Sequence, residues 1–341
     1  MSYNSIKEKF KQYKINQLQL DPYGICNAKC WFCPVKYLGN PISGKKIMDI
    51  SLINKILKNF VEERDKEDGL VDKSFSTFFT AHYNEILLYP HFEDLLKICQ
   101  NYNLSFVVLS NGIPLTPDKV DLILKYPNVI NSICLNIPGF EPEIWSLRSG
   151  INIKQYDKLI SNISYAVSNL KEMVQSKRFS IQINGVTNRS FIDGGGIMDK
   201  GDTFPNDMEL DNTSGEQFRQ RIMAMNLFPE VHIYKVSTLV DRAGLLDDVI
   251  SNKSFIKLKQ QNNKKIIGCN NGLNGGRTYS WVHVNSDGKV FLCCNDYHME
   301  IQFGDFKTQE LKDFWGSEYH INKLEESFDG ICKNCLHAVY E

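Results

Sequence analysis

Short apolar runs alternate with longer amphipathic segments through the first two-thirds of the chain. The runs have the length of strands, and the segments between them have the length of helices. Strands are expected at residues 15–20, 75–81, 104–109, 130–137, 179–186 and 231–236, and helices at 51–63, 92–102, 117–125 and 154–172. Strands that alternate with helices favour a parallel sheet with crossover connections. Six such units are fewer than the eight of a complete barrel. The sequence therefore predicts an α/β fold, a partial (β/α)6 TIM-like barrel, with catalytic groups at the carboxyl ends of its strands.

The pattern changes after about residue 245. Tyr279–Val284 and Lys289–Leu292 resemble strands, and the turn-forming tetrad Asn-Ser-Asp-Gly between them indicates a hairpin. Further on, Thr308 is expected to cap a short helix. We therefore divide the chain into a barrel domain, residues 1–245, and a small C-terminal α+β domain, residues 246–341.

The composition excludes several classes of protein. Of the 341 residues, 42% are hydrophobic and 23% charged, which is typical of a globular protein. The formal charge is −1, so no strong basic excess predicts a nucleic-acid partner. No apolar run approaches the roughly 18 residues of a membrane span, and the polar start lacks the apolar stretch of a secretory signal. We expect a cytoplasmic protein without a membrane or nucleic-acid partner, and a mobile loop over the glycine-rich residues 191–211.

The ten cysteines are informative in a reducing compartment, because clustered thiols there are more often ligands or catalysts than disulfides. Cys26, Cys30 and Cys33, the first cysteine group, directly follow the first predicted strand. Three thiolates suit a four-iron cluster with one open iron, because a cysteine usually ligates each iron. A closed zinc site needs a fourth ligand, for which His82 is the candidate, and both alternatives are open. Two cysteines stand alone in apolar stretches and are expected to be buried: Cys99 and Cys134.

The motif Cys-x3-Cys-x2-Cys after the first strand resembles the cluster motif of the radical S-adenosylmethionine (SAM) enzymes, and Phe32 fits the aromatic residue that this family places before the third cysteine. The resemblance implies that Cys26, Cys30 and Cys33 hold a [4Fe-4S] cluster whose open iron binds the amino and carboxylate groups of SAM. It also implies one-electron cleavage of the sulfonium to a 5′-deoxyadenosyl radical, with an external electron donor such as flavodoxin or ferredoxin. The cofactor then performs the radical chemistry, and the protein positions the cofactor against the substrate and excludes competing reactions.

A second match follows the next predicted strand. The stretch His82–Pro90 resembles the GGE-like motif with which the family contacts the methionine amino group. Tyr83 and Asn84 replace its two glycines, and Glu85 is retained. The resemblance implies that Glu85 accepts from the SAM ammonium. The alternative is a solvated charge at the start of a helix.

The later strands end in polar residues that also match the family. Ser110 and Asn111 open a Ser-Asn-Gly turn that resembles the TNG turn, and Asn136 stands near the usual polar positions after strand four. Arg148 either binds the SAM carboxylate with its planar guanidinium or lies on a helix surface. Asp241–Gly244 resembles another recurrent segment, with a structural or substrate-facing role.

Cys269, Cys293, Cys332 and Cys335 form a second cysteine group. The arrangement resembles the twitch form of the SPASM auxiliary-cluster domain, and implies one auxiliary [4Fe-4S] cluster held by these four residues. A structural zinc site with four thiolates is the alternative. Cys294 beside Cys293 is either a hydrogen-atom donor, as in related epimerases, or a small packing residue.

The resemblance leads to an oxidoreductase or epimerase that abstracts a hydrogen atom from a polar, carbohydrate-like small molecule. The first alternative is a peptide-modifying maturase, although only about 15 residues precede the first strand where many maturases carry a leader-binding domain. A second alternative, from another class, is a zinc-binding interaction protein.

Overall fold

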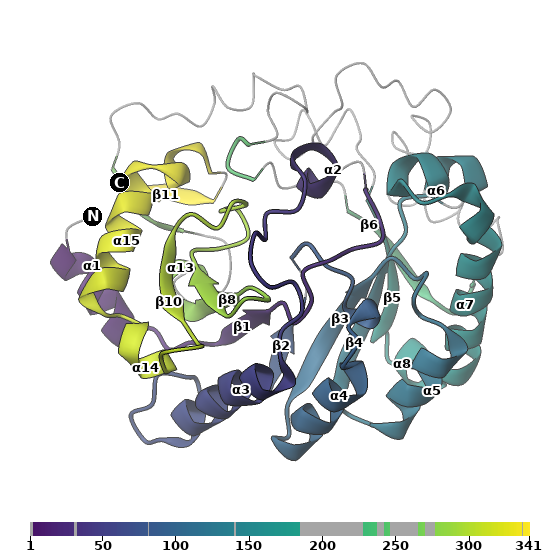
Figure 1. The fold of residues 1–341 in the computed structure, drawn as a ribbon, viewed down its shortest axis with the longest axis horizontal. Coiled ribbons are helices and arrows are strands. Elements are labelled where there is room, and N and C mark those ends of the chain that lie inside the picture. Colours follow the sequence, from purple (N-terminus) through teal and green to yellow (C-terminus); the bar gives the residue numbers. More distant parts are fainter. Residues whose placement is uncertain are drawn as a thin grey trace.

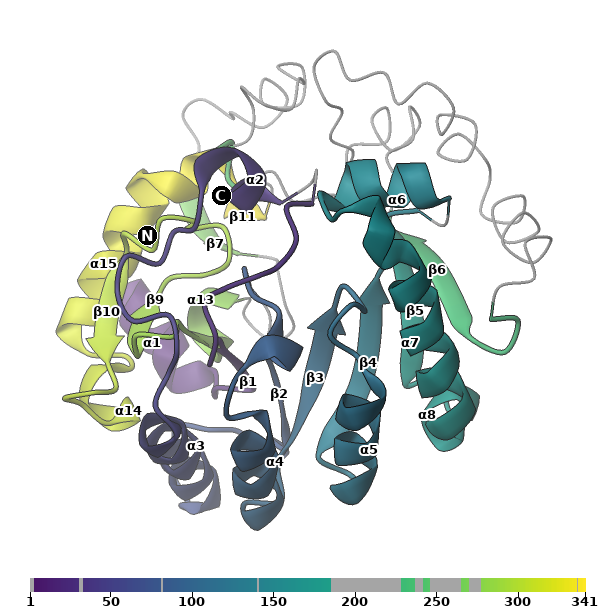
Figure 2. The same ribbon diagram turned by 45° about the vertical axis from the view of Figure 1, so that its right-hand side comes forward.

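A computed structural model describes residues 3–30, 33–80, 82–139, 141–184, 228–236, 242–245, 265–269, 277–335 and 337–341. Phe32 and the expected loop 191–211 lie outside these residues. Six parallel strands follow one another in chain order, as the sequence predicted (Figures 1 and 2): β1 (Gln17–Leu20), β2 (Thr77–Phe79), β3 (Ser105–Ser110), β4 (Ile130–Asn136), β5 (Phe179–Asn184) and β6 (His232–Val236).

Helices line the outer side of this curved sheet (Figure 2). They are α3 (Ile50–Asp65), α4 (Phe92–Asn101), α5 (Pro117–Lys125), α7 (Tyr156–Asn169) and α8 (Lys171–Gln175). The expected helix 154–172 is wrong in one respect, because the 3-10 turn η2 (Ile153–Gln155) precedes α7 and a break at Leu170 separates α7 from α8. The alternation of strand and helix confirms the predicted α/β partial barrel.

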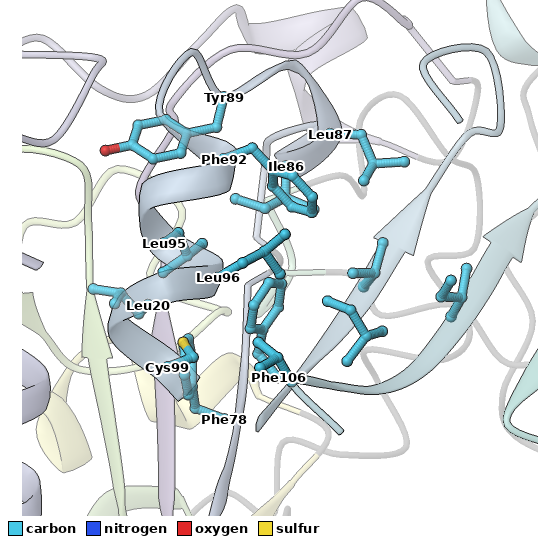
Figure 3. Packing of buried hydrophobic residues seen from close by; sticks show 14 of the residues in the cluster. Leu20, Phe78, Ile86, Leu87, Tyr89, Phe92, Leu95, Leu96, Cys99 and Phe106 are labelled. Carbon is cyan, nitrogen blue, oxygen red and sulfur yellow. The ribbon is translucent and has the colours of Figure 1, made fainter. Parts of the chain in front are cut away.

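The main core lies between the helices and the sheet. Figure 3 shows Leu95, Leu96 and Cys99 of α4 beside Phe78 of β2 and Phe106 of β3. The rings of Phe78 and Phe106 are 5.5 Å apart. Burial of each leucine or phenylalanine side chain contributes roughly 1.5–3 kcal/mol to the free energy of unfolding. Cys99 is buried, as the sequence predicted.

The C-terminal segment extends the same sheet. The expected hairpin is present as β8 (Trp281–Val284) and β9 (Lys289–Phe291), followed by β10 (Gln302–Asp305). β8 pairs in parallel with β1, giving the order β10-β9-β8-β1-β2-β3-β4-β5-β6. The two predicted domains therefore share one nine-stranded sheet. The hairpin begins later than expected, because Tyr279 and Ser280 belong to the short helix α13 (Arg277–Ser280).

The remaining C-terminal elements pack against the start of the chain. α1 (Tyr3–Gln12) lies beside α15 (Glu318–Asp329) in Figure 1. β7 (Ile266–Cys269) pairs with β11 (Ala338–Tyr340) in a separate two-stranded sheet, next to the turn η3 (Ile331–Asn334).

The short helix α14 (Leu311–Phe314) corrects one prediction. Its N-cap is Glu310, in a capping box with Asp313, and not Thr308. In the part of the chain that the structure describes, no helix has the length and apolar character needed to cross a membrane.

Candidate active site

The first cysteine group lies on the loop between β1 and the helix α2 (Pro34–Leu38). Main-chain hydrogen bonds hold this loop at both ends of the group. Glu85 N donates to Ile25 O at 3.0 Å, Lys29 N donates to Ser149 O at 2.9 Å, and Cys33 N donates to Cys30 O at 2.9 Å. The loop is thus fixed to the segment after β2 and to the end of the helix α6 (Pro142–Ser149).

The three cysteines share a cavity of about 150 Å³ with residues that follow β2, β3 and β4. The lining is Cys26, Ala28, Cys30, Cys33, Val35, His82, Tyr83, Asn84, Glu85, Leu109, Ser110, Asn111 and Asn136. The cavity therefore sits at the carboxyl ends of the first four strands. The structure brings together here all but one of the residues that the sequence singled out for SAM.

Glu85 is the buried acid of this cavity, with 1% of its surface exposed. Its Oε2 accepts from Asn111 N at 2.8 Å and from Ser110 Oγ at 3.1 Å, and its Oε1 accepts from Leu87 N at 3.3 Å. Burial raises the pKa of Glu85 to about 7, although these three hydrogen bonds oppose the rise. The alternative of a solvated charge is wrong. A carboxylate can accept about four hydrogen bonds, so one position on Oε1 is left for a ligand.

The turn after β3 has a backbone conformation that requires a glycine. Gly112 has φ +83°, where a residue with a Cβ is strained. A Cβ there would lie 2.6 Å from Leu159 Cδ1. Asn111 Nδ2 donates to Asn27 Oδ1 at 2.7 Å, which joins the turn to the cysteine loop.

His82 is not available as a zinc ligand. Its Nδ1 lies 2.6 Å from Asp21 Oδ2, and its Nε2 lies 2.9 Å from His283 Nδ1. Both ring nitrogens are therefore committed, and the side chain is fully buried. Asn84 Nδ2 donates to the other Asp21 oxygen at 2.9 Å. Sequence reasoning missed Asp21, which the pairing of β1 with β2 brings to His82, and His283, which the pairing of β1 with β8 brings there.

Arg148 is the predicted SAM residue that the cavity lining does not include. It is 1% exposed in α6, so the alternative of a helix-surface arginine is wrong. Its Nη1 donates to Pro138 O at 3.2 Å, beneath the segment that follows β4.

The first cysteine group fits an iron–sulfur cluster by its chemistry. Burial raises the pKa of Cys26 to about 12 and raises the pKa values of Cys30 and Cys33, so the free residues are thiols that metal binding would deprotonate. In the described ranges, no three His, Cys, Asp or Glu side chains are gathered to hold a single metal ion. A cluster does not need that convergence, because each cysteine ligates a different iron.

The second cysteine group comes from three places in the C-terminal segment. Cys269 ends β7, Cys293 follows β9, and Cys332 and Cys335 lie in and just after η3. Cys332 interacts electrostatically with Cys335 and Cys269, and Cys293 with Cys332 and Cys335. Asn295 Nδ2 donates to Cys335 Sγ at 3.2 Å. Four buried or half-buried thiols from segments far apart in sequence fit a second cluster, in which such hydrogen bonds tune the sulfur ligands.

Cys294 is buried next to Cys293 of the second cysteine group. Its carbonyl oxygen accepts from Tyr83 Oη at 2.8 Å and from Arg242 Nη1 at 2.9 Å, and its Sγ contacts Arg277 Nη1. Tyr83 lines the cavity, whereas Cys294 does not. Sequence reasoning missed Arg277, since nothing near it in the sequence indicates this contact.

Family comparison agrees with this geometry. The family model described as the Radical SAM superfamily matches residues 20–193, just over half of the chain, and the SPASM model, an iron–sulfur cluster-binding domain, matches residues 276–336. The chain belongs to the radical SAM superfamily and carries a SPASM domain. The predicted SAM, [4Fe-4S] cluster and auxiliary iron–sulfur centre are thereby confirmed as the cofactors of this class.

Solved structures share the fold. BtrN in complex with AdoMet (SAM) and 2-DOIA has a TM-score of 0.53 at 12% identity, covering 96% of this chain and 94% of that one. Native anSMEcpe with bound AdoMet has 0.51 at 15%, covering 94% and 86%. Streptococcus suis SuiB has 0.52 at 14%, covering 97% and 73%. At these identities the likeness concerns the fold alone, and no curated protein matches the chain.

Proposed function

We propose that this protein is a radical SAM oxidoreductase or epimerase that abstracts a hydrogen atom from a polar, carbohydrate-like small molecule. One observation carries the proposal. Cys26, Cys30 and Cys33 open onto the same cavity as Glu85 and the polar ends of β3 and β4. A cavity lined by thiols, a buried acid and amides suits a cluster beside a polar, zwitterionic cofactor.

Each group in the cavity has a role in holding the cofactors. The three cysteines would ligate three irons, and the fourth iron would take the amino and carboxylate groups of SAM. Glu85 would accept a hydrogen bond from the N–H of the SAM amino group with its remaining Oε1 position. Ser110 and Asn111 keep the Glu85 carboxylate in place. The chemistry supplied by the bound cluster is one-electron cleavage of SAM to methionine and a 5′-deoxyadenosyl radical.

The second cysteine group would hold one auxiliary [4Fe-4S] cluster, as in a twitch-like domain. Cys269, Cys293, Cys332 and Cys335 supply four thiolates, the usual complement for one cluster. Clustered thiols that serve as metal ligands suit a reducing compartment such as the cytoplasm. An electron donor such as flavodoxin or ferredoxin would supply the electron. Because Cys294 does not line the cavity, it would donate a hydrogen atom only to a substrate that extends beyond the cavity.

A peptide-modifying reaction is the second candidate. Among solved structures of the same fold, one holds AdoMet and 2-DOIA, whereas anSMEcpe was solved with the Cp18Cys peptide and SuiB with the precursor peptide SuiA. The fold thus serves both kinds of substrate. The acid and amide side chains at the carboxyl ends of the strands, Glu85, Asn111 and Asn136, support the small polar molecule.

Metal analysis after anaerobic reconstitution tests the metal sites. Wild type should bind about eight irons in two clusters, and the Cys26→Ala/Cys30→Ala/Cys33→Ala variant about half as many. Cys332→Ala should lose the second cluster and keep the first. Cys99→Ala, a buried cysteine outside both groups, is the matched control and should bind iron as wild type does. Zinc in place of iron in the wild-type protein would instead support the interaction protein.

Isotope transfer tests the substrate class. Deuterated aminocyclitols, deuterated sugars and deuterated peptides are each incubated with the reduced enzyme and SAM. The proposal expects deuterium in 5′-deoxyadenosine with a cyclic polyol. Transfer from peptides alone would support the maturase.

A further inference from the structure

Two arginines meet at Cys294, which adjoins Cys293 of the second cysteine group. Arg242 donates to its carbonyl oxygen at 2.9 Å, and Arg277 contacts its sulfur. Each guanidinium also lies over an aromatic ring. Arg242 is 5.4 Å from the centroid of Tyr83, and Arg277 is 4.5 Å from that of Trp281. Both cations are therefore fixed by at least two contacts.

Neither arginine has an acidic partner within the described ranges. The Nε atoms of Arg242 and Arg277 are buried there without a hydrogen-bond partner. Both residues are half-buried, and taking part of a cation out of water is costly unless a negative charge compensates it. These two positive charges therefore call for an anion that the described side chains do not supply.

The two cysteine groups are where that negative charge would arise. The Arg242 guanidinium interacts electrostatically with Cys33 of the first group and with Cys293 of the second. Thiols that bind iron give up their protons, so a loaded cluster with its thiolates is an anion. Each added electron makes that anion more negative. A fixed cation nearby stabilises the reduced form more than the oxidised form, and it does so strongly where water is excluded.

We propose that Arg242, assisted by Arg277, is a positioning residue that supplies the counter-charge of the second iron–sulfur cluster and raises its reduction potential. This inference rests on the proposed function, because it requires that Cys269, Cys293, Cys332 and Cys335 hold a cluster. The cluster would then be easier to reduce than one without a neighbouring cation. Arg242 acts through charge, and not by ligating iron.

Redox titration of the second cluster alone tests the charge. The Cys26→Ala/Cys30→Ala/Cys33→Ala variant provides the background, because its remaining iron reports only the second group. In this background, Arg242→Gln removes the charge but keeps a polar side chain of similar length. The midpoint potential should become more negative. Arg242→Lys keeps the charge and should stay close to the parent value. Arg178→Gln, which removes a surface cation that pairs with Glu172, should leave the potential unchanged.

The outcomes separate the inference from the function on which it rests. An iron-loaded Arg242→Gln protein with the parent potential would overturn the role of Arg242. If Arg242→Gln fails to fold, the potentials of Arg277→Gln and Arg242→Lys are compared with that of the parent variant. A more negative potential in Arg277→Gln but not in Arg242→Lys supports the counter-charge. Equal potentials in all three proteins overturn it. Absence of iron from the parent variant, before either arginine is changed, would instead contradict the proposed second cluster.

Discussion

The phenol of Tyr83 donates a hydrogen bond to the main-chain carbonyl of Cys294 at 2.8 Å. Tyr83 follows β2 and lines the cavity of the first cysteine group, whereas Cys294 adjoins the second. The Tyr83 ring also packs edge-on against Tyr297, with centroids 4.7 Å apart. A side chain at a position where the family motif carries glycine thus connects the surroundings of the two groups.

Removing the Tyr83 hydroxyl should lower the free energy of unfolding only slightly, because the ring stays in the core. Tyr83→Phe keeps the ring and deletes one buried hydrogen bond, which costs about 1 kcal/mol. Arg242 still satisfies the Cys294 carbonyl, so the loss should not exceed this value. The measurement is the free energy of unfolding in urea. Tyr165→Phe, whose hydroxyl bonds Asp121 at the surface, is the control and should change little. Equal losses in the two variants would contradict a specific role for the buried bond.

Glu85 should matter for cofactor affinity through its charge. Glu85→Gln keeps the shape of the side chain but removes the carboxylate that faces the cavity. A charge-assisted hydrogen bond contributes roughly 1.5–3 kcal/mol, so SAM should bind about 10–100-fold more weakly. Equilibrium dialysis with the reconstituted protein measures the dissociation constant. Glu93→Gln, which breaks a surface pair with Lys125, should bind SAM as wild type does. Unchanged affinity in Glu85→Gln would rule out the contact with the SAM amino group.

His320 should make the fold sensitive to acid. It is buried in α15, its Nδ1 accepts from Gly316 N at 3.1 Å, and its ring stacks on Phe303 with centroids 3.6 Å apart. Burial lowers its pKa to about 3. Between that value and the usual 6.5, the unfolded chain binds a proton that the folded chain does not, so stability falls as the pH falls. The contribution approaches about 1.4 kcal/mol per pH unit below pH 6.

A variant isolates this contribution. His320→Asn retains an acceptor near the Nδ1 position but has no proton to gain. It should be less stable than wild type at pH 7, because the ring stacking is lost, yet its stability should depend less on pH between 5 and 7. Urea unfolding across this range gives both quantities. His91→Asn, at an exposed histidine, should keep the wild-type slope. Parallel pH profiles for wild type and His320→Asn would contradict the assignment.

The sequence was sufficient for the barrel because each strand lies in a short segment with recurrent apolar residues, set between segments of helix length. The six expected strands agree with β1 to β6 to within a few residues, since buried parallel strands need no alternation. β7 and β11 could not be predicted in the same way. They are four and three residues long, and they pair across most of the C-terminal segment without a connecting turn.

The site residues likewise include some that the sequence predicts and some that it does not. Ser110 ends β3, Asn111 directly follows it, and Glu85 lies in the segment after β2, so their meeting at one edge of a parallel sheet was predictable. The contact of His82 with His283 depends instead on the register that places Gln19 opposite His283. No local pattern encodes that register, and the same holds for the approach of Arg277 to Cys294.

Reductive cleavage of SAM is the most direct test of the central claim. Reconstituted protein is incubated without oxygen with SAM and dithionite, and 5′-deoxyadenosine is quantified by chromatography and mass spectrometry. Wild type and Cys99→Ala should both form it, and the Cys26→Ala/Cys30→Ala/Cys33→Ala variant should form none. Formation of 5′-deoxyadenosine by the triple variant at the wild-type rate, or none by an iron-loaded wild type, would contradict an open iron held by the first cysteine group.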